Sequence, residues 1–309
     1  MDNEVCLLII YNHRYDRNIK TLNQIYQSRF SNIYHIIPFY DGTEQNVITV
    51  YECSFRFEGY VAQAMKQIKE KYTHYLFIGD DAIINPAINE TNYREWFGIT
   101  EKSAFITFTK TIKQMKGWGI NRRFMDPFPK FEEYQGTLWE NEIMSAEEAF
   151  AIAEKQGYSK EEFVMDLSMI WNARKKWKAY PRLIVMFGKI LIGGKKYCPY
   201  PIWGGYSDVF VIPGKDMERV AHMLGVFAAM GIFVEEAIPT ALHLNCEELV
   251  EEKDIQAVSH TLWSNDERNE IEKKYDRDLY RLMNEWDRNF LFIHPIKLSR
   301  WKFMQGAFL

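Results

Sequence analysis

Apolar runs and amphipathic stretches alternate along the first part of the chain. Residues Val5–Ile10 are continuously apolar, which is typical of a strand covered on both faces. An apolar stripe at helical spacing follows, formed by Ile19, Leu22, Ile25 and Tyr26. A second apolar run, IYHIIPFY, then leads to Asp41 and Gly42. This order predicts a β-α-β unit that ends in a turn.

The same scheme then repeats. ITVYEC is typical of a strand, an apolar stripe predicts a helix from about Tyr60 to Lys71, and HYLFIG is the next strand. Strands that alternate with helices predict an α/β fold with a mostly parallel sheet flanked by helices. Ligands of such sheets bind beyond the carboxyl ends of the strands, where we expect Asn12, Asp41 and the pair Asp80-Asp81.

The middle of the chain predicts an insert. Residues 110–141 are rich in aromatics, Gly and Pro, which indicates a loop-rich excursion. Two capping boxes, Ser145 with Glu148 and Ser159 with Glu162, predict the starts of two helices, and Gly157 is expected to end the first.

After the insert the strand and helix patterns return. VFVIP predicts a strand, and the helix after it is expected to end at Gly231. The charged segment 264–289 has apolar residues at helical spacing and predicts an amphipathic helix. We therefore expect a single domain over residues 1–309, with a loop-rich and helical insert at 111–200 and a C-terminal helical segment.

Composition narrows the class of protein. The 309 residues are 47% hydrophobic, which is typical of globular proteins, and the net charge of −4 gives no reason to expect nucleic-acid binding. The four cysteines lack CxxC spacing, and the N-terminus lacks the basic region of a signal peptide, so we expect a reduced, cytoplasmic protein. Because no apolar segment reaches about 18 residues, membrane contact is expected to be peripheral at most.

The stretch FIGDD is the first candidate for chemistry. Asp80 and Asp81 follow an apolar strand, and carboxylate oxygens are hard ligands for a divalent cation with a bound diphosphate. The alternative is a polar turn in which Asp81 caps a backbone amide. The P-loop, GxGxxG, HExxH and GxSxG motifs are absent from the sequence, so the usual parts for nucleotide hydrolysis, dinucleotide redox chemistry, zinc proteolysis and serine hydrolysis are missing.

A strand ending in Tyr11-Asn12, a second ending in Asp41-Gly-Thr and a third ending in an acidic cluster resemble the nucleotide-sugar half of GT-A-fold glycosyltransferases, including those that build bacterial polysaccharides and lipopolysaccharides. In that fold the acidic cluster is a DxD motif, here with Gly79 in place of the first acid. The resemblance implies that Asp81 binds Mn²⁺ or Mg²⁺ bridging the donor diphosphate, with Asp80 in a supporting role.

The same resemblance assigns the two halves of the chain. Residues 1–110 would bind the nucleotide-sugar and residues 201–309 would form the acceptor side. It implies that Tyr11 and Asn12 line the base and ribose pocket and that Asp41 contacts the base or ribose. A plain Asp-Gly turn is the alternative for Asp41.

Two further stretches would belong to the acceptor side. Glu235 and Glu236 open a short helix, where acids also suit the positive end of the helix dipole. The resemblance implies that Glu235, with Glu236 second, is the base that deprotonates the acceptor hydroxyl. In WGGYSD, the aromatic and the paired glycines suggest a sugar-binding wall, and the alternative is a glycine turn beside a packed Trp. The residues of this stretch are Trp203, Gly204, Gly205 and Asp208.

The C-terminal stretch FIHPIKL would complete the donor site. The resemblance implies that His294 is a second metal ligand and that Lys297 contacts the diphosphate, although a lone His is more often structural. The basic and aromatic tail that follows, which includes Trp301 and Phe308, either rests on an anionic membrane surface or packs on the domain.

Together these features predict a metal-assisted hexosyltransferase. It would move a sugar from a nucleotide-sugar donor, with UDP as the favoured nucleotide, to a hydroxyl of a glycan or lipid-linked glycan. Two alternatives stay open: a sugar nucleotidyltransferase that uses Asp80 and Asp81 as a two-metal pair, and a non-catalytic glycan-binding protein with a degenerate donor site.

Overall fold

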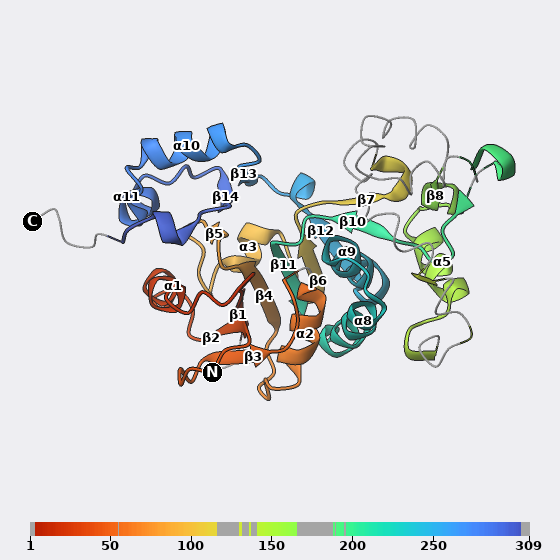
Figure 1. Cartoon of the computed structure of the whole chain (residues 1–309), viewed down its shortest axis with the longest axis horizontal. Helices are drawn as coiled ribbons and strands as arrows, with labels where there is room; N and C mark the ends of the chain where they lie inside the picture. Colours follow the sequence, from red (N-terminus) through yellow and green to blue (C-terminus); the bar gives the residue numbers. More distant parts are fainter. Residues whose placement is uncertain are drawn as a thin grey trace, which may run out of the picture.

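A seven-stranded sheet with the order β12-β6-β11-β4-β1-β2-β3 forms the centre of the computed structural model (Figure 1). The structure describes residues 4–54, 56–115, 130–131, 136, 141–165, 188, 190–194 and 196–303. The strands of the sheet are β1 (Val5–Ile10), β2 (Ile33–Pro38), β3 (Val47–Val50), β4 (His74–Gly79), β6 (Ser103–Ile106), β11 (Val209–Pro213) and β12 (Glu248–Glu251). Only β11 runs against its neighbours, and the other pairings in this sheet are parallel. The predicted α/β class with a mostly parallel sheet is confirmed.

Strand β1 shows why the first apolar run has no polar alternation. Its side chains alternate between two hydrophobic cores, one on each face of the sheet, and all six residues are buried. Cys6, Leu8 and Ile10 belong to one core, while Leu7 and Ile9 belong to the other. A strand with both faces covered is apolar throughout.

Helices cover both faces (Figure 1). One core contains residues of α2 (Phe57–Met65), α5 (Ala146–Lys155), α8 (Met217–Met230) and α9 (Val234–Asn245). The other contains residues of α1 (Asn18–Tyr26), α3 (Tyr93–Phe97), α10 (Asn265–Lys274) and α11 (Leu279–Asn284). Helices α2 and α8 pack closely through glycine, because a Cβ on Gly59 would lie 3.1 Å from the Cβ of Ala228.

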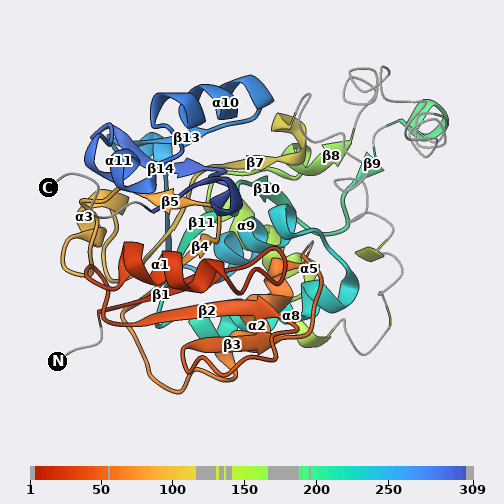
Figure 2. The same cartoon turned by 60° about the vertical axis from the view of Figure 1, so that its left-hand side comes forward.

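Smaller sheets join distant parts of the chain. A three-stranded sheet pairs β5 (Ile83–Ile84) with β14 (Phe290–His294) and β14 with β13 (Val258–Thr261). Figure 2 shows β5 beside β14, and in sequence β5 begins two residues after Asp81. The remaining short elements are β7 (Thr109–Thr111) with β10 (Trp203–Gly205), β8 (Val164–Met165) with β9 (Lys196–Tyr197), and the 3-10 helices η1 (Ile112–Gln114), η3 (Lys160–Phe163), η5 (Glu252–Asp254) and η6 (Leu298–Arg300).

The capping boxes have different outcomes. Ser145 caps α5, since its hydroxyl accepts the Glu148 N–H at 3.2 Å, and Gly157 follows the helix with φ of 89°. Both predictions are confirmed. The second box is not a helix cap: Ser159 makes no side-chain cap bond, and only the 3-10 helix η3 forms there.

Two predicted helices differ in length. The helix expected to reach Lys71 ends at Met65, although Ile68 and Tyr72 still contribute to the core. The segment 264–289 forms two helices, α10 and α11, because Asp276 and Arg277 have positive φ angles of 52° and 56°. Much of the predicted excursion at 110–141 lies outside the described residues. Within the described part, no helix is long and apolar enough to cross a membrane.

Candidate functional site

The turn after β4 is held by the backbone of two neighbouring segments. Asp80 and Asp81 are buried, with only 3% and 4% of their surface exposed. The Asp80 N–H donates to the Ile10 carbonyl at 2.8 Å, so the turn is tied to the carboxyl end of β1. The Asp81 carbonyl accepts the Ile296 N–H at 2.7 Å, which ties the turn to the segment after β14. The two acids therefore lie at a fixed place on the carboxyl edge of the sheet.

The side chains of Lys297 and His294 face Asp81. The Lys297 ammonium contacts one carboxylate oxygen, and Nε2 of His294 lies 3.2 Å from the other. Burial alone would raise the pKa of Asp81, but His294 and Lys297 outweigh it and hold that pKa well below its usual range. Asp81 is therefore ionised over the whole physiological pH range. The sequence-predicted residues Asp81, His294 and Lys297 are thus brought together in space.

Asp208 approaches the same cluster from the antiparallel strand. The Gly79 N–H donates to the Asp208 carbonyl at 2.8 Å, and Oδ1 of Asp208 lies 3.7 Å from Nε2 of His294. A Cβ on Gly79 would lie 3.4 Å from Oδ1 of Asp81 and 3.8 Å from Oδ1 of Asp208. A Cβ at this position would therefore be in ordinary contact with two carboxylates.

Tyr206 orients the histidine. Its hydroxyl is hydrogen-bonded to Nδ1 of His294, which leaves Nε2 facing Asp81 and Asp208. Burial, followed by the charges of Asp208 and Asp81, raises the pKa of Tyr206 far above its usual value, so the hydroxyl keeps its proton. Burial opposes a charge on His294, but the two carboxylates outweigh it and raise the pKa of the imidazole.

Asp80 takes part in a separate hydrogen-bond network. Its carboxylate accepts a hydrogen bond from the Asn18 amide at 3.0 Å, at the start of α1. Burial and the neighbouring charge of Asp81 raise the pKa of Asp80 to about 7, against smaller effects of Asn18 and the Asn12 backbone. Asp80 therefore links the acid turn to the loop after β1.

Asp81 and His294 have suitable chemistry for a divalent cation when the imidazole is neutral. A carboxylate oxygen and an imidazole nitrogen lie 3.2 Å apart at one point of the sheet edge. Among the described residues, no set of three or more His, Cys, Asp and Glu side chains is arranged to hold a metal ion. A cation at this pair would therefore take its other ligands from substrate or water.

The predicted nucleoside residues lie beside this cluster with different exposure. Tyr11 is completely buried, and its hydroxyl is hydrogen-bonded to Nδ1 of His35 at 2.8 Å, so it presents no surface to a ligand. Asn12 is half-buried. The Asp41 side chain is 75% exposed and is paired with Arg14 from the loop after β1. The structure thus leaves Asn12 and Asp41 accessible at the ends of β1 and β2.

The predicted bases lie in the first turn of α9. Glu236 is completely buried, whereas Glu235 is half-buried. Glu235 is close enough to Tyr206 for its charge to add to the raised pKa of that hydroxyl, after the larger effects of burial, Asp208 and Asp81. Glu235 is therefore the member of the pair that lies near the cluster with an accessible carboxylate.

The glycine-rich stretch has a structural explanation. Trp203 is completely buried and stacks on His243 with ring centroids 4.3 Å apart. A Cβ on Gly205 would lie 2.5 Å from the Phe108 carbonyl oxygen, so only glycine fits there. Gly204 lies between them in β10, paired with β7. A buried indole offers no face to a sugar. The residues of this stretch that reach the cluster are Tyr206 and Asp208, which both contact His294.

Neither the models of known protein families nor the curated proteins give a match to this chain. Function is therefore inferred from the geometry of the site.

Three residues that the sequence did not single out complete the site. They are Arg14, which pairs with Asp41, Asn18, which binds Asp80, and Tyr206, which binds His294. Each lies within one of the polar stretches that follow or precede a strand, YNHRYDRN and WGGYSD. Their position at strand ends was the available signal, but their partners are far away in sequence.

The C-terminal tail is engaged with the domain as far as it is described. Arg300 pairs with Glu272 at 2.8 Å, and Trp301 is buried. Phe308 lies outside the described residues. The membrane alternative for this tail would therefore have to use residues other than Arg300 and Trp301.

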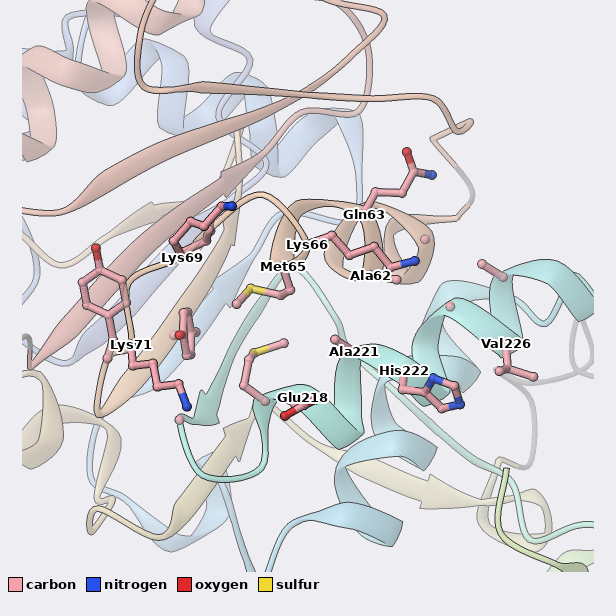
Figure 3. Close-up of a pocket in the computed structure, with 18 of the residues that line it drawn as sticks. Ala62, Gln63, Met65, Lys66, Lys69, Lys71, Glu218, Ala221, His222 and Val226 are labelled. Atoms are coloured by element: carbon pink, nitrogen blue, oxygen red, sulfur yellow. The ribbon is translucent and has the colours of Figure 1, made fainter. Parts of the chain in front are cut away.

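A cavity of about 1290 Å³ lies elsewhere, between α2 and α8 (Figure 3). Met65 and Lys66 line one side of it, and Glu218 and His222 of α8 line the other. It reaches Tyr75 near the amino end of β4, whereas Asp80 and Asp81 follow the carboxyl end. Ligands of α/β sheets collect at the carboxyl ends, so the acid cluster is the stronger candidate for chemistry.

Proposed function

We propose that this protein is a GT-A-like glycosyltransferase that moves a sugar from a nucleotide-sugar, with UDP as the favoured nucleotide, to a glycan or lipid-linked glycan hydroxyl. The observation that carries the proposal is the ionised Asp81 at the end of a central strand, in contact with both Lys297 and His294. This cluster combines a cation ligand pair with an ammonium group at the edge where α/β sheets bind phosphates. The strand order and the single antiparallel strand are compatible with this fold.

The leaving diphosphate would be bound by the cluster around Asp81. Asp81 and His294 would hold a Mn²⁺ or Mg²⁺ ion, which would neutralise the charge that develops on the leaving group. Lys297, half of whose side chain is exposed, would form charge-assisted hydrogen bonds to the phosphate oxygens. Asp208 and Tyr206 would keep the imidazole of His294 in place.

The nucleoside would lie at the ends of β1 to β3. Asn12 and Asp41 remain the proposed contacts for the ribose and base. Phe39 and Tyr51 add an exposed aromatic pair next to Asp41, with ring centroids 5.9 Å apart. Phe39 has a positive φ of 54°, which is strained for a residue with a side chain and is typical of functional positions. Its ring is suited to stack on a nucleobase.

The acceptor would approach from the side of α9. If the reaction inverts the anomeric configuration, Glu235 takes the proton from the attacking hydroxyl. If the configuration is retained, Glu235 has no such role. Glu236 is buried in the core, which makes Glu235 the first choice.

We also propose a cytoplasmic location, with peripheral membrane contact where the acceptor is lipid-linked. It is supported by Cys6 and Cys246, two buried cysteines that form no disulfide.

The decisive experiment is to incubate the full chain with UDP-, GDP- and dTDP-sugars and Mn²⁺, with acceptor glycans, and to measure released nucleoside diphosphate. We expect release in the wild type, loss in Asp81→Asn, and slow transfer with unchanged UDP binding in Glu235→Gln. Glu154→Gln, the same change on an exposed position of α5, is the control and should behave as wild type.

The alternatives give different products. Pyrophosphate formed from UTP and a sugar 1-phosphate would indicate a nucleotidyltransferase. Glycan binding without any nucleotide binding, measured by titration calorimetry with UDP and Mn²⁺, would indicate a non-catalytic glycan-binding protein. Normal turnover in Asp81→Asn would contradict the proposed role of the cluster.

A further inference from the structure

Trp263 is an exposed aromatic residue immediately beside the candidate site. It follows β13, in which Thr261 pairs with His294 of β14, and the Leu262 N–H donates to the His294 carbonyl at 2.7 Å. The indole is 62% exposed, and its edge meets the ring of Tyr206 with centroids 5.8 Å apart. Trp263 is therefore connected to the cluster in two ways. The backbone of its neighbour Leu262 binds the backbone of His294, and its indole contacts Tyr206, whose hydroxyl binds the His294 side chain.

The backbone of Trp263 is fixed on both sides. Before it, the strand β13 is paired with β14. After it, Ser264 forms a capping box with Glu267: the Glu267 carboxylate accepts the Ser264 N–H at 2.6 Å, and the Ser264 hydroxyl accepts the Glu267 N–H at 3.1 Å. The indole is thus presented to solvent from a rigid position, which lowers the entropic cost of binding a ligand.

Local helix packing does not account for an indole here. An apolar residue before an N-cap usually packs against an apolar residue at the fourth helical position. That position of α10 is Arg268, whose guanidinium donates to the Asn265 side chain at 2.6 Å. Trp263 therefore has no hydrophobic staple partner, and most of its surface stays open.

A strip of aromatic and charged groups runs from Trp263 through the buried ring of Tyr206 to Phe108, which is half-buried. The ring of Tyr206 lies nearly parallel to that of Phe108, with centroids 6.2 Å apart, and the Lys110 ammonium lies 5.2 Å from the Phe108 ring. Asp208 and Glu235 carry charges close to Tyr206. A pyranose suits such a strip, because its C–H face matches the negative face of an aromatic ring and its hydroxyls can bind carboxylates and an ammonium.

We propose that Trp263 stacks on a pyranose ring of the acceptor and, with Phe108 and Lys110, forms the acceptor subsite next to His294. The assignment of this sugar to the acceptor rests on the proposed transferase function. The subsite itself is a carbohydrate-binding surface that exists whether or not a nucleotide binds.

Saturation-transfer NMR on the full chain tests this subsite without turnover. The probes are the methyl glycosides of glucose, galactose, mannose and N-acetylglucosamine at millimolar concentration. We expect at least one probe to receive saturation mainly at the protons of one ring face. Trp263→Ala should weaken its binding about tenfold, the effect of losing one stacked aromatic face. Trp263→Phe should keep most of the binding.

Tyr280→Ala, which removes a 39% exposed ring from α11, is the matched control and should bind as the wild type does. The inference is overturned if no probe binds the wild type or if Trp263→Ala binds as well as Tyr280→Ala. Calorimetry with UDP and Mn²⁺ on the same proteins separates the two proposals. Sugar binding that depends on Trp263 without UDP binding would refute the transferase and support the subsite, whereas UDP binding without such sugar binding would refute the subsite alone.

Discussion

Replacing Gly79 by Asp places an acid where the DxD motif of the proposed family has one, and tests the electrostatics of the cluster. Position 79 can accept a side chain, because the new Cβ would lie 3.4 Å from Oδ1 of Asp81 and 3.8 Å from Oδ1 of Asp208. The new carboxylate would then join two others in a buried space. Its attraction to His294 and Lys297 is limited, since both already face Asp81.

The expected effect follows from Coulomb's law. Two unit charges about 4 Å apart repel by about 4 kcal/mol at an effective dielectric constant of about 20. Partial compensation by the two cationic groups leaves a net loss of about 2–4 kcal/mol in the free energy of unfolding, or roughly 3–6 °C in Tm for a chain of this size. A cation that binds only the folded state returns about 2.7 kcal/mol at a concentration of 100 times its Kd.

Thermal unfolding in EDTA and in Mn²⁺ measures both effects. Gly79→Asn adds nearly the same volume without charge and is the matched control. The double variant Gly79→Asp with Asp208→Asn keeps the number of carboxylates constant, so it should recover most of the stability lost in EDTA. We expect Mn²⁺ to raise the Tm of Gly79→Asp more than that of the wild type.

Two results would refute this reasoning. If Gly79→Asp and Gly79→Asn lose equal stability in EDTA, the loss is steric and the cluster does not repel a third carboxylate. If Mn²⁺ raises the Tm of Gly79→Asp no more than that of Gly79→Asn, the carboxylates do not converge on a cation.

Three further changes test other parts of the structure. Lys297→Met should weaken UDP binding roughly 10- to 100-fold by calorimetry, because it removes one charge-assisted hydrogen bond. Uridine binding should stay unchanged, and an equal loss of affinity for both ligands would argue against a diphosphate contact. Burial raises the pKa of the Glu58 carboxyl in the folded state well above its ordinary value of 4.5. The stability that the protonated carboxyl contributes is therefore fully present below pH 4.5 and is lost as pH rises through the folded-state pKa. Glu58→Gln should therefore gain stability relative to wild type at pH 8 but not at pH 4 in denaturant melts, and a constant difference would contradict this. Trp203→Ala should lower the free energy of unfolding by about 3–5 kcal/mol in the same melts, because it removes a core aromatic. A variant that kept its stability and lost only sugar binding would support the sequence prediction that Trp203 binds a sugar.

The sheet was predictable because its signal is local. Strands such as β1 and β4 are buried on both faces, so each is visible as a continuous apolar run, and the acids that end β4 stand at the expected edge. The break between α10 and α11 has no such signal, because neither Gly nor Pro occurs at Asp276 or Arg277. Backbone pairing with a distant residue accompanies the break: the Lys302 N–H donates to the Arg277 carbonyl, and the Leu279 N–H donates to the Lys302 carbonyl, each at 2.8 Å.

The two tryptophans show that contacts between distant residues also decide which side chains reach the site. The aromatic and paired glycines of this stretch predict a sugar-binding wall with Trp203, yet Gly205 serves close packing, because a Cβ there would lie 2.5 Å from the Phe108 carbonyl oxygen and 2.9 Å from Pro239 of α9. Trp263 lies in a polar stretch whose motif, the capping box of Ser264 with Glu267, predicts the start of a helix and not a ligand site. Trp has both a large apolar surface and a polar N–H, so its place in a sequence says little about burial. The pairing of β13 with β14 brings Trp263 to the site, and such pairings are not visible in a single sequence.

The C-terminal strand ties the proposed donor site to the folding of the whole chain. β14 pairs with β5 directly after the acid turn, and the Ile296 N–H binds the Asp81 carbonyl, so backbone hydrogen bonds set the positions of His294 and Lys297. These cations are therefore placed before any substrate binds, and the cost of burying Asp81 as an anion is met during folding. Without this segment Asp80 and Asp81 would face each other in a buried turn with no cation nearby. The proposed donor site therefore depends on the C-terminal segment as well as on the first hundred residues, which do not themselves supply His294 or Lys297.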